Sequence, residues 1–411
     1  METKEIAKRA RAASYKLLSL SSKEKDSILL KIASVFSEKK EDLLKENERD
    51  LEYGKQIGLS NALMDRLLLN EKRISDIASG IKAVALLPDP VFEIYDMTRR
   101  PNGMLVGKMR HPLGVIGIIY EARPNVTLDA FSLCFKSSNS VILKGGSEAL
   151  NSNKFIVKVI KDVLSESNLG DAIGFVEERE GVKELASLKE YIDCIILRGG
   201  KRLISEIGEG AKVPIISHGE GICHTYIDNE ADLKMAEEIA YNAKVQRPGV
   251  CNAMETLLVH SDIARDILPN LIKKLKDAGC EIRGDERVGE IVKDIIPATE
   301  EDWKTEYLSL ILSIKIIDSL DEAISHINHY GSHHSDSIVT NSYSKALRFL
   351  KEIDSASVYV NVSTRFTDGF EFGMGAEIGT STQKLHARGP MGLKELTSSK
   401  FIILGEGQIR K

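Results

Sequence analysis

This 411-residue chain has few of the features that mark secreted, membrane-bound or metal-stabilised proteins. It has one tryptophan, 6% aromatic residues and five cysteines without a C-x-x-C pair, so neither a disulfide framework nor a structural zinc site is expected. No apolar run approaches the length of a membrane span, and the charged amino terminus lacks the apolar core of a signal peptide. The net charge of −5 argues against a general nucleic-acid or membrane surface. We therefore expect a reducing, cytoplasmic setting.

What the chain does contain is enough apolar material for large cores. Hydrophobic residues make up 42% of it, and its length favours two or three domains. The first 90 residues or so are expected to be helical, because apolar residues recur at helical spacing among lysines and glutamates. Residues 94–111 should form an extended ribbon, with Asn102-Gly103 at its hairpin turn.

After the ribbon, apolar strands alternate with amphipathic helices. This alternation predicts an α/β protein with parallel, doubly wound sheets. The expected strands are residues 115–120, 140–144, 194–197, 256–260, 337–340 and 357–361. The expected helices are residues 126–136, 149–165, 201–208, 231–244, 263–277 and 343–353. A last strand, residues 400–404, should complete another sheet or the sheet of another subunit.

Cys251 is the leading candidate for chemistry. It follows Arg247-Pro248-Gly249 and precedes an apolar strand, and a thiol on a glycine-positioned turn suits a nucleophile. A cysteine before a strand is also commonly a small buried residue, as we expect for Cys134, Cys194 and Cys223. Upstream, another buried strand ends in a polar turn that reaches Asn125. The two segments together suggest acyl chemistry through a thioester.

Two glycine turns follow strands and open helices. They are Lys144-Gly145-Gly146-Ser147 and Arg198-Gly199-Gly200. Glycines let the backbone approach a phosphate, and a helix amino terminus favours an anion. Each turn could also be only a tight strand–helix connection, with Ser147 capping a helix. Two such turns in one sheet favour dinucleotide binding.

Histidines and paired carboxylates give no metal site. Adjacent His333 and His334 would diverge in a strand and are better explained as a polar loop. His218, His224 and His386 lie near glycines and are either polar site residues or ordinary loop residues. We expect no metal.

Longer strings resemble a known family. They are residues 120–127, 245–252, 365–369, 375–379 and 383–393. Through them the chain resembles the gamma-glutamyl phosphate reductase (glutamate-5-semialdehyde dehydrogenase) family of the aldehyde dehydrogenase superfamily, over nearly its whole length.

The resemblance implies an aldehyde dehydrogenase-like fold of two doubly wound, Rossmann-like domains and a small β oligomerisation ribbon. Residues 1–93 and 112–228 would form the NADP-binding domain, and residues 229–364 the catalytic domain. Residues 94–111 and 365–411 would form the ribbon and a carboxy-terminal substrate loop.

The resemblance also implies an activity: NADPH-dependent reduction of L-glutamyl 5-phosphate to L-glutamate 5-semialdehyde and phosphate, in proline biosynthesis. The enzyme would be a homo-oligomer, coupled to a separate glutamate kinase, with no nucleic-acid or membrane partner. Alternatives are a CoA-dependent or hydrolytic aldehyde dehydrogenase, and a catalytically silent scaffold on the same fold.

The family's roles transfer to particular positions. Cys251 matches the nucleophile, and Asn125 matches an oxyanion donor beside the Cys251 backbone N–H. Lys144 matches the lysine that reaches the adenosine ribose or its phosphate, and Glu306 the glutamate that holds the nicotinamide ribose. Ser217 stands where oxidising relatives carry the glutamate that activates water.

The remaining candidates come from charge and turn chemistry. Arg123, Arg365 and Arg388 could hold the acyl phosphate and the α-carboxylate, because both anions suit bidentate cations. Ser147, in the first glycine turn, stands where NAD-using relatives carry an acidic side chain, which predicts a preference for NADPH.

Overall fold

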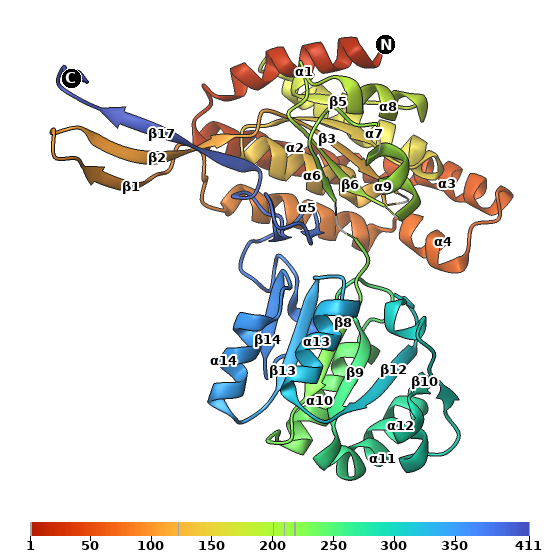
Figure 1. Ribbon diagram of the computed structural model, residues 1–411. Coiled ribbons are helices and arrows are strands. Elements are labelled where there is room, and N and C mark those ends of the chain that lie inside the picture. Colours follow the sequence, from red (N-terminus) through yellow and green to blue (C-terminus); the bar gives the residue numbers. More distant parts are fainter. Residues whose placement is uncertain (1, 122, 200, 209, 218, 411) are drawn as a thin grey trace. The chain divides into compact units, whose positions relative to one another are not determined.

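A computed structural model describes residues 2–121, 123–199, 201–208, 210–217 and 219–410 (Figure 1). The chain forms two compact units: one comprises Met1–Ser217, Gly373–Gly379 and Met391–Lys411, and the other His218–Phe372 and Thr380–Pro390. The domain boundaries inferred from sequence stay a proposal. They end the first domain at residue 228, whereas the main segment of the first unit ends at Ser217, because the strand Cys223–Ile227 pairs within the second unit's sheet.

The amino-terminal region is helical, as predicted. Its helices are α1 (Thr3–Leu17), α2 (Ser22–Glu38), α3 (Lys40–Gln56), α4 (Asn61–Leu67) and α5 (Glu71–Leu86). Helix α2 begins with a capping box, in which the Ser21 and Glu24 side chains each bond the other residue's backbone N–H. Helices α2 and α3 pack against the later helix α7 (Leu150–Ser165), and α5 packs against α6 (Pro124–Lys136).

The first unit is built on a parallel sheet of order β5-β4-β3-β6-β7, counted over the described residues. Its strands are β3 (Val115–Tyr120), β4 (Ser140–Lys144), β5 (Ile173–Phe175), β6 (Cys194–Arg198) and β7 (Ile215–Ser217). Helices α1 and α8 (Glu180–Ser187) share an apolar cluster with one face of the sheet. Helices α6 and α7 also contact the sheet, and α9 (Lys201–Gly208) follows β6. Short 3-10 helices, η1 (Ser147–Ala149) and η2 (Gly170–Ala172), complete the connections.

An antiparallel ribbon belongs to the same unit. It consists of β1 (Ile94–Arg99), β2 (Leu105–Pro112) and β17 (Thr397–Leu404), and Figure 1 shows it extending away from the parallel sheet of this unit. Asn102-Gly103 forms the turn between β1 and β2, where Gly103 has φ +90°. Strand β17 pairs with β2 from Thr397–Pro112 to Leu404–Leu105. The predicted ribbon and final strand are therefore confirmed.

The second unit holds another parallel sheet, of order β11-β10-β12-β9-β8-β13-β14 within the described ranges. Its strands are β8 (Cys223–Ile227), β9 (Met254–His260), β10 (Glu281–Gly284), β11 (Ile296–Pro297), β12 (Ile311–Ile317), β13 (Ser335–Val339) and β14 (Ser357–Val360). A short antiparallel pair, β15 (Thr380–Ser381) and β16 (Gly389–Pro390), lies in the same unit. The α/β class with parallel sheets is confirmed.

Helices flank this second sheet in two groups. Helices α10 (Leu233–Val245), α11 (Ser261–Asp277) and α12 (Glu286–Ile291) share one apolar cluster with β9, β10 and β12. Helices α13 (Leu320–Tyr330) and α14 (Tyr343–Glu352) contribute to a separate cluster with Tyr226, Leu258 and Ile338. The 3-10 helices η3 (Asp302–Lys304) and η4 (Thr364–Phe366) lie in loops. Among the described residues, no helix is both long and apolar enough to span a bilayer.

Candidate active site

Cys251 lies on the loop that joins α10 to β9. We call residues 246–253 the cysteine loop. The Cys251 side chain is half-buried, whereas Cys134, Cys194 and Cys223 are buried in cores as predicted. The loop is anchored through the next residue, because Thr364 Oγ1 donates to the Asn252 carbonyl (2.7 Å) and Asn252 Nδ2 donates to the Thr367 carbonyl (2.8 Å).

The backbone at Cys251 is held from a second direction. A Cβ at Gly221 would lie 1.9 Å from the Cys251 carbonyl oxygen, so only glycine permits this approach. The Cys223 thiol donates to the same carbonyl at 3.1 Å. Burial raises the pKa of Cys223 well above its usual value, which keeps this thiol protonated and able to donate. Cys223 therefore supports the cysteine loop and is held as a thiol.

A buried ion pair closes the cysteine loop at its base. Lys244, in the last turn of α10, donates to Glu255 on β9 (Nζ–Oε2 2.5 Å), and both side chains are at most 1% exposed. The other Glu255 oxygen accepts from the Leu308 backbone N–H at 3.2 Å. Glu306, two residues before Leu308, accepts a hydrogen bond from the Gly221 N–H at 2.9 Å. The predicted ribose-binding glutamate is thus bonded to the glycine that packs on the Cys251 backbone.

Arg365 is the arginine that the structure brings to Cys251. Its Nε donates to Gln246 Oε1 at 2.9 Å, and its Nη1 donates to Asn252 Oδ1, so both contacts are made to the cysteine loop. Burial and the neighbouring Arg247 lower the pKa of Arg365. Cys251 lies close enough that its charge as a thiolate would raise that pKa. A guanidinium beside a thiol favours the thiolate.

The other two arginines have different surroundings. Arg388 donates to Asp354 (Nη2–Oδ1 2.8 Å), a carboxylate that also pairs with Lys384. This pairing offsets the charge that Arg388 could offer to an anion. Arg123 is half-buried in the first unit and directly precedes α6. The substrate-binding roles of all three arginines stay predictions.

Asn125 is the second residue of α6, after Pro124 at the first position. Strand β3 ends at Tyr120, so the turn after β3 leads directly to this helix amino terminus. Asn125 Nδ2 donates to Asp129 Oδ2, one helical turn later, at 3.1 Å. Burial raises the pKa of Asp129 to about 6.

The first glycine turn is tightly packed. Lys144 ends β4, is 8% exposed, and its Nζ donates to the Gly145 carbonyl at 2.6 Å. A Cβ at Gly145 would lie 2.2 Å from Asn153 Nδ2, and one at Gly146 would lie 2.1 Å from a Glu148 carboxylate oxygen. Burial lowers the pKa of Lys144, and the Glu148 charge opposes that shift. The turn therefore places a cation and an acid side by side.

The helix after this turn has two of its amino-terminal N–H groups bonded within the first unit. Ser147 is the first residue of the 3-10 helix η1, whose N-cap is Gly146, and α7 begins only at Leu150, with Ala149 as its N-cap. The Asp50 carboxylate accepts from the backbone N–H groups of Asn151 (3.0 Å) and Ser152 (2.8 Å). A carboxylate of α3 thus occupies two of the amino-terminal donors of α7, and the expected anion at this turn stays a prediction. Ser147 as a helix cap is not observed.

The second glycine turn is described only in part. Gly199 directly follows β6 and is half-buried. Gly200 lies outside the described residues, so its predicted cofactor contact stays a prediction.

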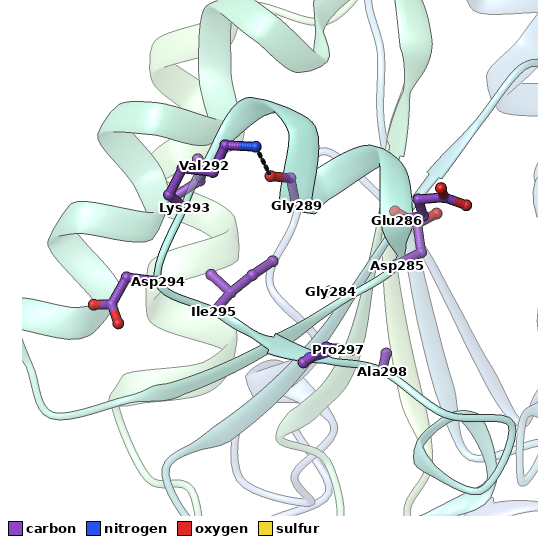
Figure 2. Close-up of a pocket in the computed structure, with 10 residues that line it drawn as sticks. All are labelled: Gly284, Asp285, Glu286, Gly289, Val292, Lys293, Asp294, Ile295, Pro297 and Ala298. Carbon is purple, nitrogen blue, oxygen red and sulfur yellow. Dashed lines mark hydrogen bonds between the residues drawn. The ribbon is translucent and has the colours of Figure 1, made fainter.

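A cavity of about 470 Å³ lies elsewhere in the second unit. Figure 2 shows its lining, which comes from β10, α12 and the segment through Ala298, with Lys293 Nζ bonded to the Gly289 carbonyl (2.8 Å). Its lining includes none of the predicted site residues among those described.

Known proteins resemble this chain in sequence and in fold. The aldehyde dehydrogenase family pattern matches residues 1–294 and 288–402. The chain is 55% identical to the gamma-glutamyl phosphate reductase of Carboxydothermus hydrogenoformans, over 100% of this chain and 99% of that protein. It is 54% identical to that of Dictyoglomus thermophilum, over 99% of both chains.

Solved structures of related proteins have the same fold. The crystal structure of gamma-glutamyl phosphate reductase from Thermotoga maritima has a TM-score of 0.97 at 48% identity and covers 100% of both chains. An acetylating aldehyde dehydrogenase from Geobacillus thermoglucosidasius shares the fold, with a TM-score of 0.69 at 15% identity, over 100% of this chain and 97% of that one. The chain therefore belongs to the aldehyde dehydrogenase family of oxidoreductases. Within that family it belongs to the gamma-glutamyl phosphate reductases, which confirms the resemblance seen in the sequence.

Proposed function

We propose that this enzyme uses NADPH to reduce L-glutamyl 5-phosphate to L-glutamate 5-semialdehyde and phosphate, in proline biosynthesis. The observation that carries this proposal is the half-buried Cys251 on a loop anchored from several directions beside Arg365. Such a loop can present one thiolate in a fixed position, as covalent acyl chemistry requires. The names of the full-length relatives specify the substrate class.

The chemistry then follows from the residues. The Cys251 thiolate attacks the acyl carbon, and the bond to phosphate breaks with its electron pair on the leaving phosphate. The Asn125 amide and the Cys251 backbone N–H stabilise the oxyanion of the tetrahedral intermediate. A bound nicotinamide cofactor would supply the hydride that reduces the resulting thioester. Collapse of the thiohemiacetal returns the thiolate and releases the aldehyde, so no water-activating base is needed, and Ser217 stands where such a base would lie.

The chain's residues fit a phosphorylated dinucleotide. Lys144 brings positive charge to the end of β4. The two glycines after it lack side chains, although Asn153 and Glu148 pack closely against them. Ser147 adds a small hydroxyl, Gly199 directly follows β6, which β3 separates from β4 in the sheet, and Glu306 would hold the nicotinamide ribose.

The test is the reverse reaction, followed as reduction of NADP with glutamate 5-semialdehyde as substrate. We expect turnover only when inorganic phosphate is present. Turnover that continues without phosphate would identify a hydrolytic enzyme, and turnover that requires CoA in its place would identify an acylating one. If NADP is reduced under none of these conditions, the remaining alternative is a catalytically silent scaffold on the same fold.

Arg365→Lys is expected to raise KM for phosphate in the reverse assay by about tenfold or more, the cost of losing a charge-assisted hydrogen bond. Arg123→Lys should have a similar effect if it shares the anion. Arg388→Lys is the comparison, because its guanidinium already pairs with Asp354. Unchanged KM values in all three variants would remove the arginines from the anion site.

Ser147→Glu is expected to raise KM for NADPH by about tenfold more than KM for NADH, because a carboxylate would repel the 2′-phosphate. Ser147→Gln, similar in size but neutral, separates charge from bulk. Glu148 is already close to Lys144, and its presence reduces the preference that Ser147 can provide. Equal effects on both cofactors, or a wild-type preference for NADH, would show that this turn does not select the cofactor.

The ribbon is the surface that we propose for homo-oligomer formation. Ile94, Phe401, Ile403 and Leu404 are exposed on its strands, with 52% to 67% of each residue's surface accessible. Exposed apolar side chains on an unpaired strand edge are typical of a surface covered by another subunit. We further propose coupling to a separate glutamate kinase, because an acyl phosphate is labile in water.

A further inference from the structure

Asp129 is a carboxylate beside the proposed oxyanion donor that the mechanism above does not use. It lies one turn after Asn125 on α6 and accepts a hydrogen bond from the Asn125 Nδ2 at 3.1 Å. A primary amide carries two N–H groups. One of them is bound to Asp129, which fixes the rotation of the amide and sets the direction of the other.

A guanidinium lies near Asp129 in the same unit. Arg198, the last residue of β6, lies close enough for its charge to stabilise the Asp129 carboxylate. Strand β6 pairs with β3, where Arg198 is opposite Tyr120. Arg198 is itself closely packed, since a Cβ at Gly379 would lie 2.2 Å from its Nη1. The Arg198 charge thus opposes part of the effect of burial, which raises the pKa of Asp129.

We propose that Asp129 is a positioning residue that orients the Asn125 amide toward the oxyanion of the acyl intermediate. The inference rests on the proposed function, in which Asn125 stabilises that oxyanion. A donor that is already oriented needs no reorganisation when charge develops, which is the main advantage of an enzymatic oxyanion site. A side-chain pair one helical turn apart adds little to helix stability, so orientation is the larger contribution expected from this bond.

Two variants of one position separate this role from a structural one. In Asp129→Leu, the side chain keeps a similar size but cannot accept a hydrogen bond. In Asp129→Asn, the charge is lost but an amide oxygen can still accept from Asn125. We expect Asp129→Leu to lower kcat of the reverse reaction about tenfold to a hundredfold, the range for a small misplacement of a catalytic group. KM for phosphate and for NADP should change less than about twofold, and Asp129→Asn should lose less than about threefold in kcat.

A double-mutant cycle completes the test. In the Asn125→Ala background, Asp129→Leu should cause no further loss of kcat, because no amide remains to be oriented. Equal losses in both backgrounds, or a loss in Asp129→Asn as large as that in Asp129→Leu, would overturn the proposal. Thermal unfolding of each variant confirms that the rates come from folded protein. Full activity of Asn125→Ala would refute the oxyanion role of Asn125 in the proposed function. An unchanged kcat in Asp129→Leu, together with a lowered kcat in Asn125→Ala, would refute only the positioning role of Asp129.

Discussion

Cys251→Ala and Cys251→Ser are expected to abolish turnover, lowering kcat by at least about 10,000-fold, the scale seen when a catalytic nucleophile is removed. Alanine has no nucleophile, and a serine hydroxyl is far less ionised than a thiol at neutral pH. NADPH binding should persist, because the predicted cofactor contacts at Lys144 and Ser147 belong to the other compact unit. Steady-state rates and a fluorescence titration with NADPH measure the two effects separately.

Cys280→Ser provides the matched control. Cys280 is only 3% exposed, packs in an apolar cluster of the second unit, and burial raises its pKa to about 11. It should therefore remain a thiol and take no part in turnover. Substantial activity in either Cys251 variant would end the thioester mechanism, whereas a rate loss in Cys280→Ser alone would point to a damaged core.

Many apolar strands and amphipathic helices were predictable from the sequence, although strand β12 and helix α13 were not predicted. Strand β9 and helix α11 show those patterns over many residues, and both were predicted from sequence. Strand β8 was missed, although it lies between β9 and β13. Its residue His224 is polar yet fully buried, because the His224 Nδ1 and backbone N–H both bond to the Asp336 carboxylate (2.9 and 2.8 Å). A buried polar pair from distant segments removes the hydrophobic signal that identifies a strand.

In the candidate site too, short-range patterns indicated some residues, whereas long-range contacts could not be predicted. Short-range patterns indicated Cys251 and Asn125 as candidates, since each follows a recognisable turn at the end of an apolar or helical run, and their roles stay predictions. Lys244 and Glu255 look like surface charges in the sequence, and only their burial in one ion pair reveals that they support the cysteine loop. Asp50 caps a helix that begins about a hundred residues later in the chain, a contact that no local pattern encodes. Long-range pairing of polar groups is thus the part that sequence reasoning missed.

Asn125→Ala is expected to lower kcat about a hundredfold to a thousandfold, the cost of removing one oxyanion donor. The donor acts only when charge develops in the transition state, so KM for phosphate and the dissociation constant for NADPH should change little. Asn125→Asp tests the sign of the effect. A carboxylate of the same shape would face both the oxyanion and Asp129, and its kcat should fall at least as far. Pre-steady-state trapping of the acyl enzyme would place the loss in the chemical step. A defect confined to NADPH affinity would instead make Asn125 a cofactor-binding residue and leave the backbone N–H of Cys251 as the proposed donor.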